Sequence, residues 1–188
     1  MSYASSYQLR GYVVNPLSVR VIRDKASYVR SALGLTKEPI DLEIFLERLS
    51  EFGITVDVVN DEDMPGFSYH SEACCIPETA TIYLTEGTYR KACLNDARTR
   101  FTIFHELGHL ILGHSRELHR ANMTTNVKPF QDSEWQADRF AGEITMPLEI
   151  IYDYELFSVG QIKNQFGVSE QAATTRYNQL LKEGVIKN

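Results

Sequence analysis

Hydrophobic and polar positions repeat with two different periods along the first half of the chain. Apolar residues recur every three to four positions over 19–33 and again over 40–51, which predicts two amphipathic helices. Over 54–59 the period changes to two and most residues are β-branched, which predicts a strand. Three further short strands are predicted, at 67–70, 73–76 and 81–84. Together the four strands predict a small antiparallel sheet.

The second half of the chain predicts helices and no strands. A helix that ends at Leu112 is apolar on most of its sides, which indicates that it is buried. A polar loop over 114–132 separates this helix from a second one over 133–145. The remainder, 148–188, is predicted to be helical, and from Ser158 onward it follows a helix-turn-helix pattern.

These elements predict an α+β fold. We expect the small sheet to pack on the buried helix and on the helix that follows it. Three parts are expected along the chain: a partly helical N-terminal segment over 1–35, a central domain over 36–155 and a helix-turn-helix-like C-terminal segment over 156–188. A chain of 188 residues suits one domain with such an appendage.

Composition narrows the class of protein. The chain is 43% hydrophobic and 23% charged, as in globular proteins, and its net charge of -6 argues against a general nucleic-acid binder. We expect a cytoplasmic protein without membrane association, because there is no secretory signal and no apolar run of about 20 residues. Cys74, Cys75 and Cys93 form no CxxC pair and are expected to be reduced and structural.

The buried helix carries the chemistry, in the sequence His105-Glu106-Leu107-Gly108-His109. Residues four apart share a helix face, so both imidazoles can reach one metal ion with Glu106 beside it. This is the HExxH arrangement, in which the glutamate is the general base toward a zinc-activated water. Two core histidines held only by hydrogen bonds are the alternative. Burying them with a carboxylate is costly, and Zn2+ would offset that cost.

A catalytic zinc needs a third protein ligand. The next helix offers Glu134 and Asp138, which are again four apart and share a face. We predict that Glu134 completes a site with His105 and His109, and that Asp138 accepts a hydrogen bond from a ring nitrogen of His105. The ordinary alternative for two such acidic residues is a solvated helix face, and the neighbouring HExxH sequence favours the ligand role.

The polar loop adds two further candidates. His114 and His119 could stabilise an oxyanion, although histidines are also common on surface loops. Nothing in the chain resembles an activated serine or cysteine nucleophile, so a covalent mechanism is not indicated.

The stretch over 98–147 resembles the ImmA/IrrE family of metallopeptidases. The matching residues are Phe104–Leu110, Glu134–Ala141 and Met146-Pro147. Asp138 stands where the family often has asparagine, and the Glu-then-Asp pair is more similar to the gluzincins, such as thermolysin. With the preceding helices and strand, the resemblance extends over about 40–165. It implies an α+β metallopeptidase, and members of the family often cleave or antagonise a helix-turn-helix repressor.

The C-terminal segment is weakly basic. From Ser158 onward it has four Lys or Arg and two Glu, a net charge of +2. Family members often have a similar segment here. Binding to DNA usually needs more cationic side chains, so we favour a small packing module or a docking surface over DNA binding.

The leading hypothesis is therefore a zinc endopeptidase with Glu106 as catalytic base, whose protein substrate is expected to be a helix-turn-helix transcriptional repressor. One alternative is a regulatory module that binds DNA or protein, retains the metal site and does not hydrolyse peptides. Another is a zinc hydrolase for a substrate other than a peptide.

Overall fold

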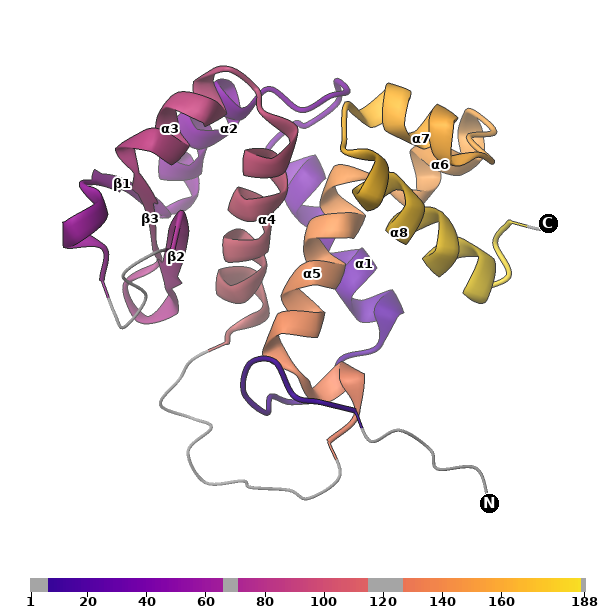
Figure 1. The fold of residues 1–188 in the computed structure, drawn as a ribbon, viewed down its shortest axis with the longest axis horizontal. Helices are drawn as coiled ribbons and strands as arrows, with labels where there is room; N and C mark the ends of the chain where they lie inside the picture. The colour runs from indigo at the N-terminus through magenta and orange to yellow at the C-terminus, as the bar shows by residue number, and fades with distance from the viewer. Residues whose placement is uncertain (1–6, 66–70, 115–126, 187–188) are drawn as a thin grey trace.

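The computed structural model describes residues 7–65, 71–114 and 127–186, which form eight α-helices and a three-stranded sheet (Figure 1). The elements are α1 (Val19–Ala32), α2 (Leu42–Leu49), β1 (Thr55–Val59), β2 (Ala73–Ile76), β3 (Thr81–Thr85), α3 (Glu86–Cys93), α4 (Ala97–Leu112), α5 (Ser133–Thr145), α6 (Leu148–Asp153), α7 (Val159–Phe166) and α8 (Glu170–Lys182). The predicted α+β class is confirmed.

Side-chain caps set the starts of the helices. Asp41 accepts hydrogen bonds from the backbone N–H groups of Glu43 and Ile44, so α2 begins after Asp41 rather than at residue 40. Asp96 caps α4 by accepting from the N–H of Thr99. These local bonds satisfy N–H groups that have no partner inside the helix, which is why the caps can be recognised in the sequence.

The sheet is mixed, and the prediction of a wholly antiparallel sheet was wrong. The strand order is β1-β3-β2, with β2 antiparallel to β3 and β1 parallel to β3. A short turn over 77–80 joins β2 to β3, which brings these consecutive strands together in opposite directions. The alternation of apolar and polar residues along β1 shows which side chains share a face of the sheet. It does not show whether β1 runs parallel or antiparallel to β3. The predicted strand at 67–70 lies outside the described residues.

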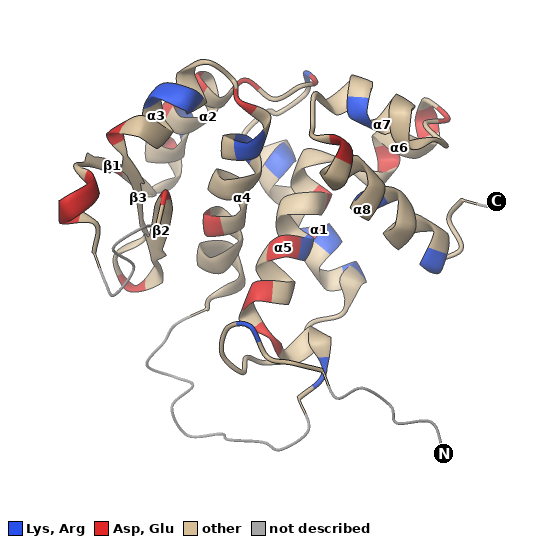
Figure 2. Ribbon diagram, viewed as in Figure 1, with Lys and Arg blue, Asp and Glu red and all other residues tan. Residues whose placement is uncertain are grey.

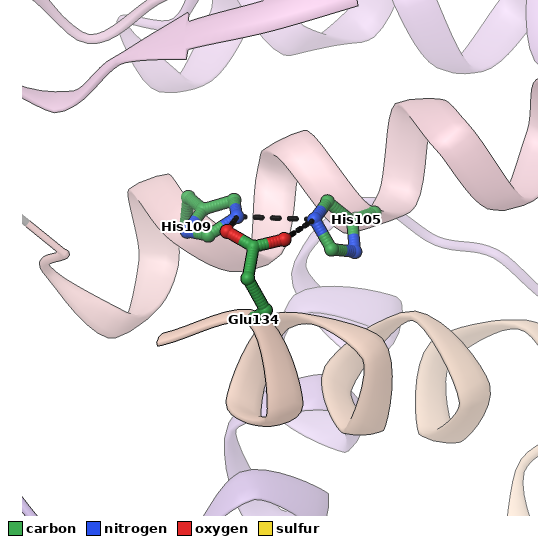
Figure 3. Close-up of side chains that lie close together, drawn as sticks. All are labelled: His105, His109 and Glu134. Carbon is green, nitrogen blue, oxygen red and sulfur yellow. Dashed lines mark hydrogen bonds and ion pairs between the residues drawn. The ribbon is translucent and has the colours of Figure 1, made fainter. Parts of the chain in front are cut away.

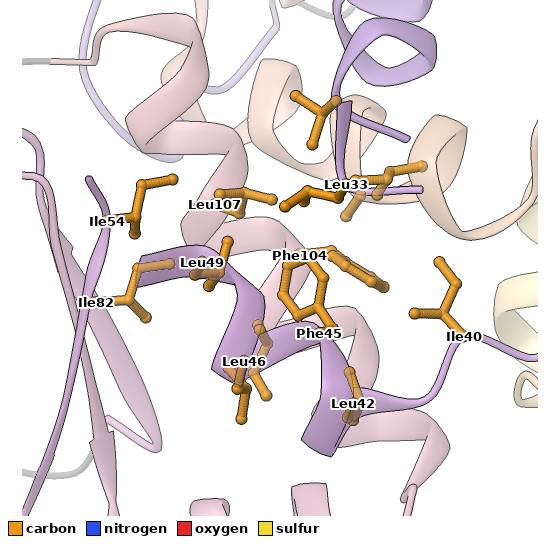
Figure 4. Packing of buried hydrophobic residues seen from close by; sticks show 14 of the residues in the cluster. Leu33, Ile40, Leu42, Phe45, Leu46, Leu49, Ile54, Ile82, Phe104 and Leu107 are labelled. Carbon is orange, nitrogen blue, oxygen red and sulfur yellow. The ribbon is translucent and has the colours of Figure 1, made fainter. Parts of the chain in front are cut away.

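The main hydrophobic core lies between the sheet and the central helices (Figure 4). Phe45 of α2 and Phe104 of α4 are both fully buried and meet edge to face, with ring centroids 4.9 Å apart and an interplanar angle of 70°. Ile82 and Leu84 of β3 are fully buried in the same cluster. The centre of α4 is thereby held between the sheet on one side and α5 on the other.

A second hydrophobic cluster belongs to α6, α7 and α8. Its buried members are Met146, Ile151, Leu156, Ile162, Phe166, Val168, Ala173, Leu180 and Ile186. Arg100 of α4 connects it to the rest of the molecule, because its guanidinium donates to the backbone carbonyls of Phe166 at 3.2 Å and Gly167 at 3.1 Å.

A buried ion cluster also joins these helices to α1 and α5, and it consists of Arg23, Arg139, Glu143, Arg176 and Glu183. The Glu143 carboxylate is fully buried and accepts from the three arginines at distances between 2.7 and 3.0 Å. Charged groups removed from water in this way need close partners of opposite sign, so the cluster holds α1, α5 and α8 in one arrangement. Within the described residues, no helix is long and apolar enough to span a bilayer.

Candidate metal centre

The site is built where α4 and α5 run close together. Gly108 of α4 faces the backbone of α5, and a Cβ atom added to it would lie 3.2 Å from both the Cα and the carbonyl oxygen of Ala137. The absence of a side chain on Gly108 and the small one on Ala137 allow this close approach. As a result, His105 and His109 on α4 face Glu134 on α5.

His105, His109 and Glu134, predicted together from the sequence, meet at one point in the structure (Figure 3). The two Nε2 atoms of the histidines lie 3.1 Å apart. The Glu134 carboxylate spans them, with Oε2 at 3.2 Å from His105 Nε2 and Oε1 at 3.4 Å from His109 Nε2. All three side chains are partly shielded from solvent, and their exposed fractions are 17%, 12% and 33%.

These distances fit a tetrahedral zinc ion. With bonds of about 2.0–2.1 Å, ligand atoms around such an ion lie about 3.3 Å from one another. The separation of 3.1 Å between the two Nε2 atoms agrees with that value, and the Glu134 carboxylate faces both nitrogens through its two oxygens, at 3.2 and 3.4 Å. Two neutral imidazoles and one carboxylate are a common donor set of catalytic zinc, which leaves a fourth position for water or substrate. The residues present therefore fit the ion.

A carboxylate lies on the far side of the His105 ring. Its Nδ1 lies 2.9 Å from Oδ1 of Asp138, and Arg10 donates to the other oxygen of Asp138 at 2.8 Å. Burial by itself lowers the pKa of His105, but the hydrogen bonds to Asp138 and Glu134 outweigh it and raise that pKa to about 10. In the metal-free protein the ring is thus protonated, and a metal ion must displace this proton to bind.

His109 has a different environment. Its Nδ1 lies 2.9 Å from Nδ1 of His114, whose Nε2 lies 3.0 Å from Oε1 of Gln136. Burial and the nearby positive charge of His105 lower the pKa of His109 to about 3. His109 is therefore neutral at physiological pH, which is the form that binds a metal.

His114 was expected on an exposed loop as a candidate for stabilising an oxyanion. It is instead 2% exposed, and both of its ring nitrogens are within hydrogen-bond distance of a side chain. The other loop candidate, His119, lies outside the described residues. Nothing in the spacing of His114 and Gln136 indicated that they would meet, since they lie on opposite sides of the long loop.

A cavity of about 590 Å³ opens over the three candidate ligands. Glu106 lines it beside the histidines, and so do the consecutive residues 73–77 of β2 and the following turn. Cys75 also lines the cavity. Burial raises the pKa of its thiol, and the negative charge of Glu106 raises it further, so Cys75 stays protonated and is a poor nucleophile. The three cysteines are free, as expected.

A family sequence model that matches most of the chain shows which protein family the chain belongs to. The sequence model of the IrrE N-terminal-like domain, Peptidase_M78, matches residues 50–178. The chain belongs to this family. M78 membership and the cluster of His105, His109 and Glu134 together indicate a metallopeptidase.

A solved structure has a similar fold. A Mycobacterium tuberculosis transcriptional regulator is similar to this chain with a TM-score of 0.55 and 16% sequence identity. The similarity covers 83% of this chain and 55% of the regulator, so the chain spans about half of that protein's length. At this identity the similarity concerns the fold alone. No curated protein matches the chain.

The N-terminal segment, which precedes the residues matched to the M78 family, lies across the start of α5. The backbone N–H groups of Arg10 and Gly11 donate to the carboxylate of Asp132 at 2.9 and 3.1 Å. Tyr12 and Ser133 exchange two further hydrogen bonds, each of 3.1 Å. This segment therefore contacts the helix turn that carries Glu134, which the sequence did not indicate.

Proposed function

We propose that this M78 protein is a zinc-dependent endopeptidase that hydrolyses a peptide bond in a protein substrate. The observation that supports the proposal most strongly is the convergence of His105, His109 and Glu134 at separations that suit one tetrahedral ion. An ion held by these residues would lower the pKa of a water molecule and polarise the carbonyl group of a substrate.

Glu106 is the proposed catalytic residue. Its side chain lines the same cavity as the two histidines and follows His105 directly on α4. A carboxylate at this position can take the proton of the attacking water and then deliver it to the amide nitrogen of the leaving group. Asp138 keeps His105 in the orientation seen in the structure, with Nδ1 toward the carboxylate and Nε2 toward Glu134.

The wall of the cavity supports an extended peptide as substrate. In the described part of the chain, β2 pairs with β3 along one side only, and residues of β2 border the cavity along the strand. An edge strand offers backbone N–H and C=O groups with which a peptide in extended conformation can pair. Following the family resemblance, we propose a helix-turn-helix transcriptional repressor as the substrate.

The charges of the C-terminal helices support a protein substrate over DNA binding. Arg176 of α8 is buried against Glu143, and Lys163 of α7 lies 3.2 Å from Glu170. Figure 2 shows few charged positions along α7 and α8, with acidic and basic ones both present. A DNA-binding surface would require several unpaired cations on one face.

The proposal is tested by incubating the purified, zinc-loaded protein with the repressor encoded by the adjacent gene and analysing the products by mass spectrometry. We expect a single new pair of fragments, which a chelator prevents from forming. Glu106→Gln should bind zinc as the wild type does and release no fragments, because the ligands remain and the base is lost.

Glu86→Gln is the matched control, since Glu86 is an exposed residue of α3 that pairs with Arg90 on the surface. It makes the same chemical change away from the site and should cleave normally. Cleavage that persists in Glu106→Gln would contradict the proposed mechanism, and repressor inactivation without cleavage would contradict the proposed function.

A further inference from the structure

The side chain of Gln136 has only one possible orientation in the structure. Its Nε2 lies 2.8 Å from the backbone carbonyl oxygen of Asn15 and 2.8 Å from that of Phe130. Carbonyl oxygens accept hydrogen bonds and cannot donate them, so the two amide hydrogens must point to these atoms. The Oε1 atom of Gln136 is then directed at Nε2 of His114, at 3.0 Å.

This orientation determines which nitrogen of His114 carries the hydrogen. An amide oxygen can only accept, so Nε2 of His114 must be the donor. The ring is buried, and in its neutral form a hydrogen on Nε2 leaves Nδ1 with a lone pair that can accept a hydrogen bond. That lone pair is directed at Nδ1 of His109, 2.9 Å away. His109 must therefore carry its own hydrogen on Nδ1.

The tautomer of His109 decides whether this residue can bind a metal ion. With a hydrogen on Nδ1, neutral His109 has its lone pair on Nε2, the atom that faces His105 and Glu134. This is the only tautomer in which His109 can bind a metal at that point. The opposite tautomer would place an N–H group where the ion must sit.

We propose that His114 is a positioning residue that, with Gln136, holds His109 in its metal-binding tautomer. The proposal rests on the proposed metal centre. The two histidine ligands are thus oriented by different groups, His105 by the carboxylate of Asp138 and His109 by a neutral chain of hydrogen bonds.

That chain ends on the N-terminal segment, at the carbonyl of Asn15, which lies before the residues matched to the M78 family. Tyr12 of the same segment packs its ring edge to face on His114, with centroids 6.5 Å apart, and its hydroxyl donates to the backbone carbonyl of His114. Residues 12–15 therefore belong to the structure that prepares the metal ligand.

The test measures zinc affinity by competition with a chromophoric chelator on metal-free protein. His114→Phe fills most of the same volume without an acceptor, and Gln136→Met removes the amide while keeping the side-chain length. We expect both to weaken zinc binding about 10- to 100-fold, the range typical of residues that orient a metal ligand. His114→Asn should recover most of the affinity, because its amide oxygen can accept from His109.

Gln171→Met is the matched control, since Gln171 is exposed on α8, and it should bind zinc as the wild type does. Should the buried variants fail to fold, as judged by circular dichroism, the wild type itself provides the test. Long-range ¹⁵N NMR of the zinc-loaded protein should then show His114 with its hydrogen on Nε2 and His109 with its hydrogen on Nδ1.

Undiminished affinity in folded His114→Phe and Gln136→Met, or the opposite tautomer of His114 in the spectra, would overturn the proposal while leaving the metal centre intact. A wild-type protein that binds no zinc would instead overturn the metal centre and the positioning role with it. The two failures are distinguishable because the first leaves zinc binding by the wild type intact and the second does not. Neither measurement depends on peptide hydrolysis.

Discussion

Glu143 lies at the centre of the buried ion cluster, and its charge should make the stability of the protein depend on pH. The carboxylate contacts Arg23 of α1, Arg139 of its own helix and Arg176 of α8. Glu183 is the other acidic group of the cluster and lies 2.6 Å from Arg23. Glu143→Gln keeps the size of the side chain and removes its negative charge.

The magnitude follows from the carboxylate pKa. Burial opposes ionisation of Glu143, but the hydrogen bonds and charge of Arg176, with those of Arg23 and Arg139, lower its pKa from 4.5 to about 2. A tenfold change in proton affinity is worth about 1.4 kcal/mol, so the ionised form contributes roughly 3 kcal/mol to stability at pH 7. Glu143→Gln should cost at least that much, because all three arginines lose the carboxylate that they contact, and the remaining one, Glu183, contacts Arg23 and Arg139.

The sign of the pH dependence is set by the lowered pKa. The contribution is fully present above the unfolded-state value of 4.5 and is lost as pH falls toward 2. Urea unfolding followed by circular dichroism should therefore show a gap of roughly 3 kcal/mol between wild type and Glu143→Gln at pH 7, and about half of that or less at pH 3. A chelator is included, because metal binding has a pH dependence of its own.

Other carboxylates also titrate in this range, but they are common to both proteins and cancel in the difference. A gap that stays constant between pH 7 and pH 3 would refute the reasoning, since it would mean that the loss comes from packing rather than from charge. A variant as stable as the wild type at pH 7 would show that the cluster gains no more from its pairing than it loses by desolvation.

Two further substitutions test how the helices and the N-terminal segment shape the site. Gly108→Ala should lower the melting temperature of the metal-free protein, a net loss of about 1 kcal/mol, because crowding against the backbone of Ala137 exceeds the gain in helix propensity. Stability equal to or above that of the wild type would show that α5 can shift without cost. Gly11→Ala should weaken zinc binding in the chelator assay, because the added Cβ would lie 2.2 Å from Ser133 Oγ and 2.8 Å from Glu134 Cγ. Unchanged affinity would show that Glu134 keeps its position when the segment moves away.

Much of the candidate site was predictable because it depends on neighbours along one helix. His105 and His109 lie four residues apart, and Glu134 and Asp138 repeat that spacing on the next helix, so each pair shares a face whatever the tertiary structure. The helices themselves begin at polar caps and follow an apolar period, both of which are local signals. Family membership depends on the same local sequences.

Tertiary structure alone decided what joins these helices to distant parts of the chain. The hydrogen bond from Gln136 to Asn15 spans 121 residues of sequence, and no period or spacing encodes such a contact. The direction of β1 was equally undetermined, because alternation specifies the faces of a strand and not its partner. Helix periodicity arises from backbone geometry over a few residues. The orientation of His109 depends instead on how α4, α5 and the N-terminal segment pack together.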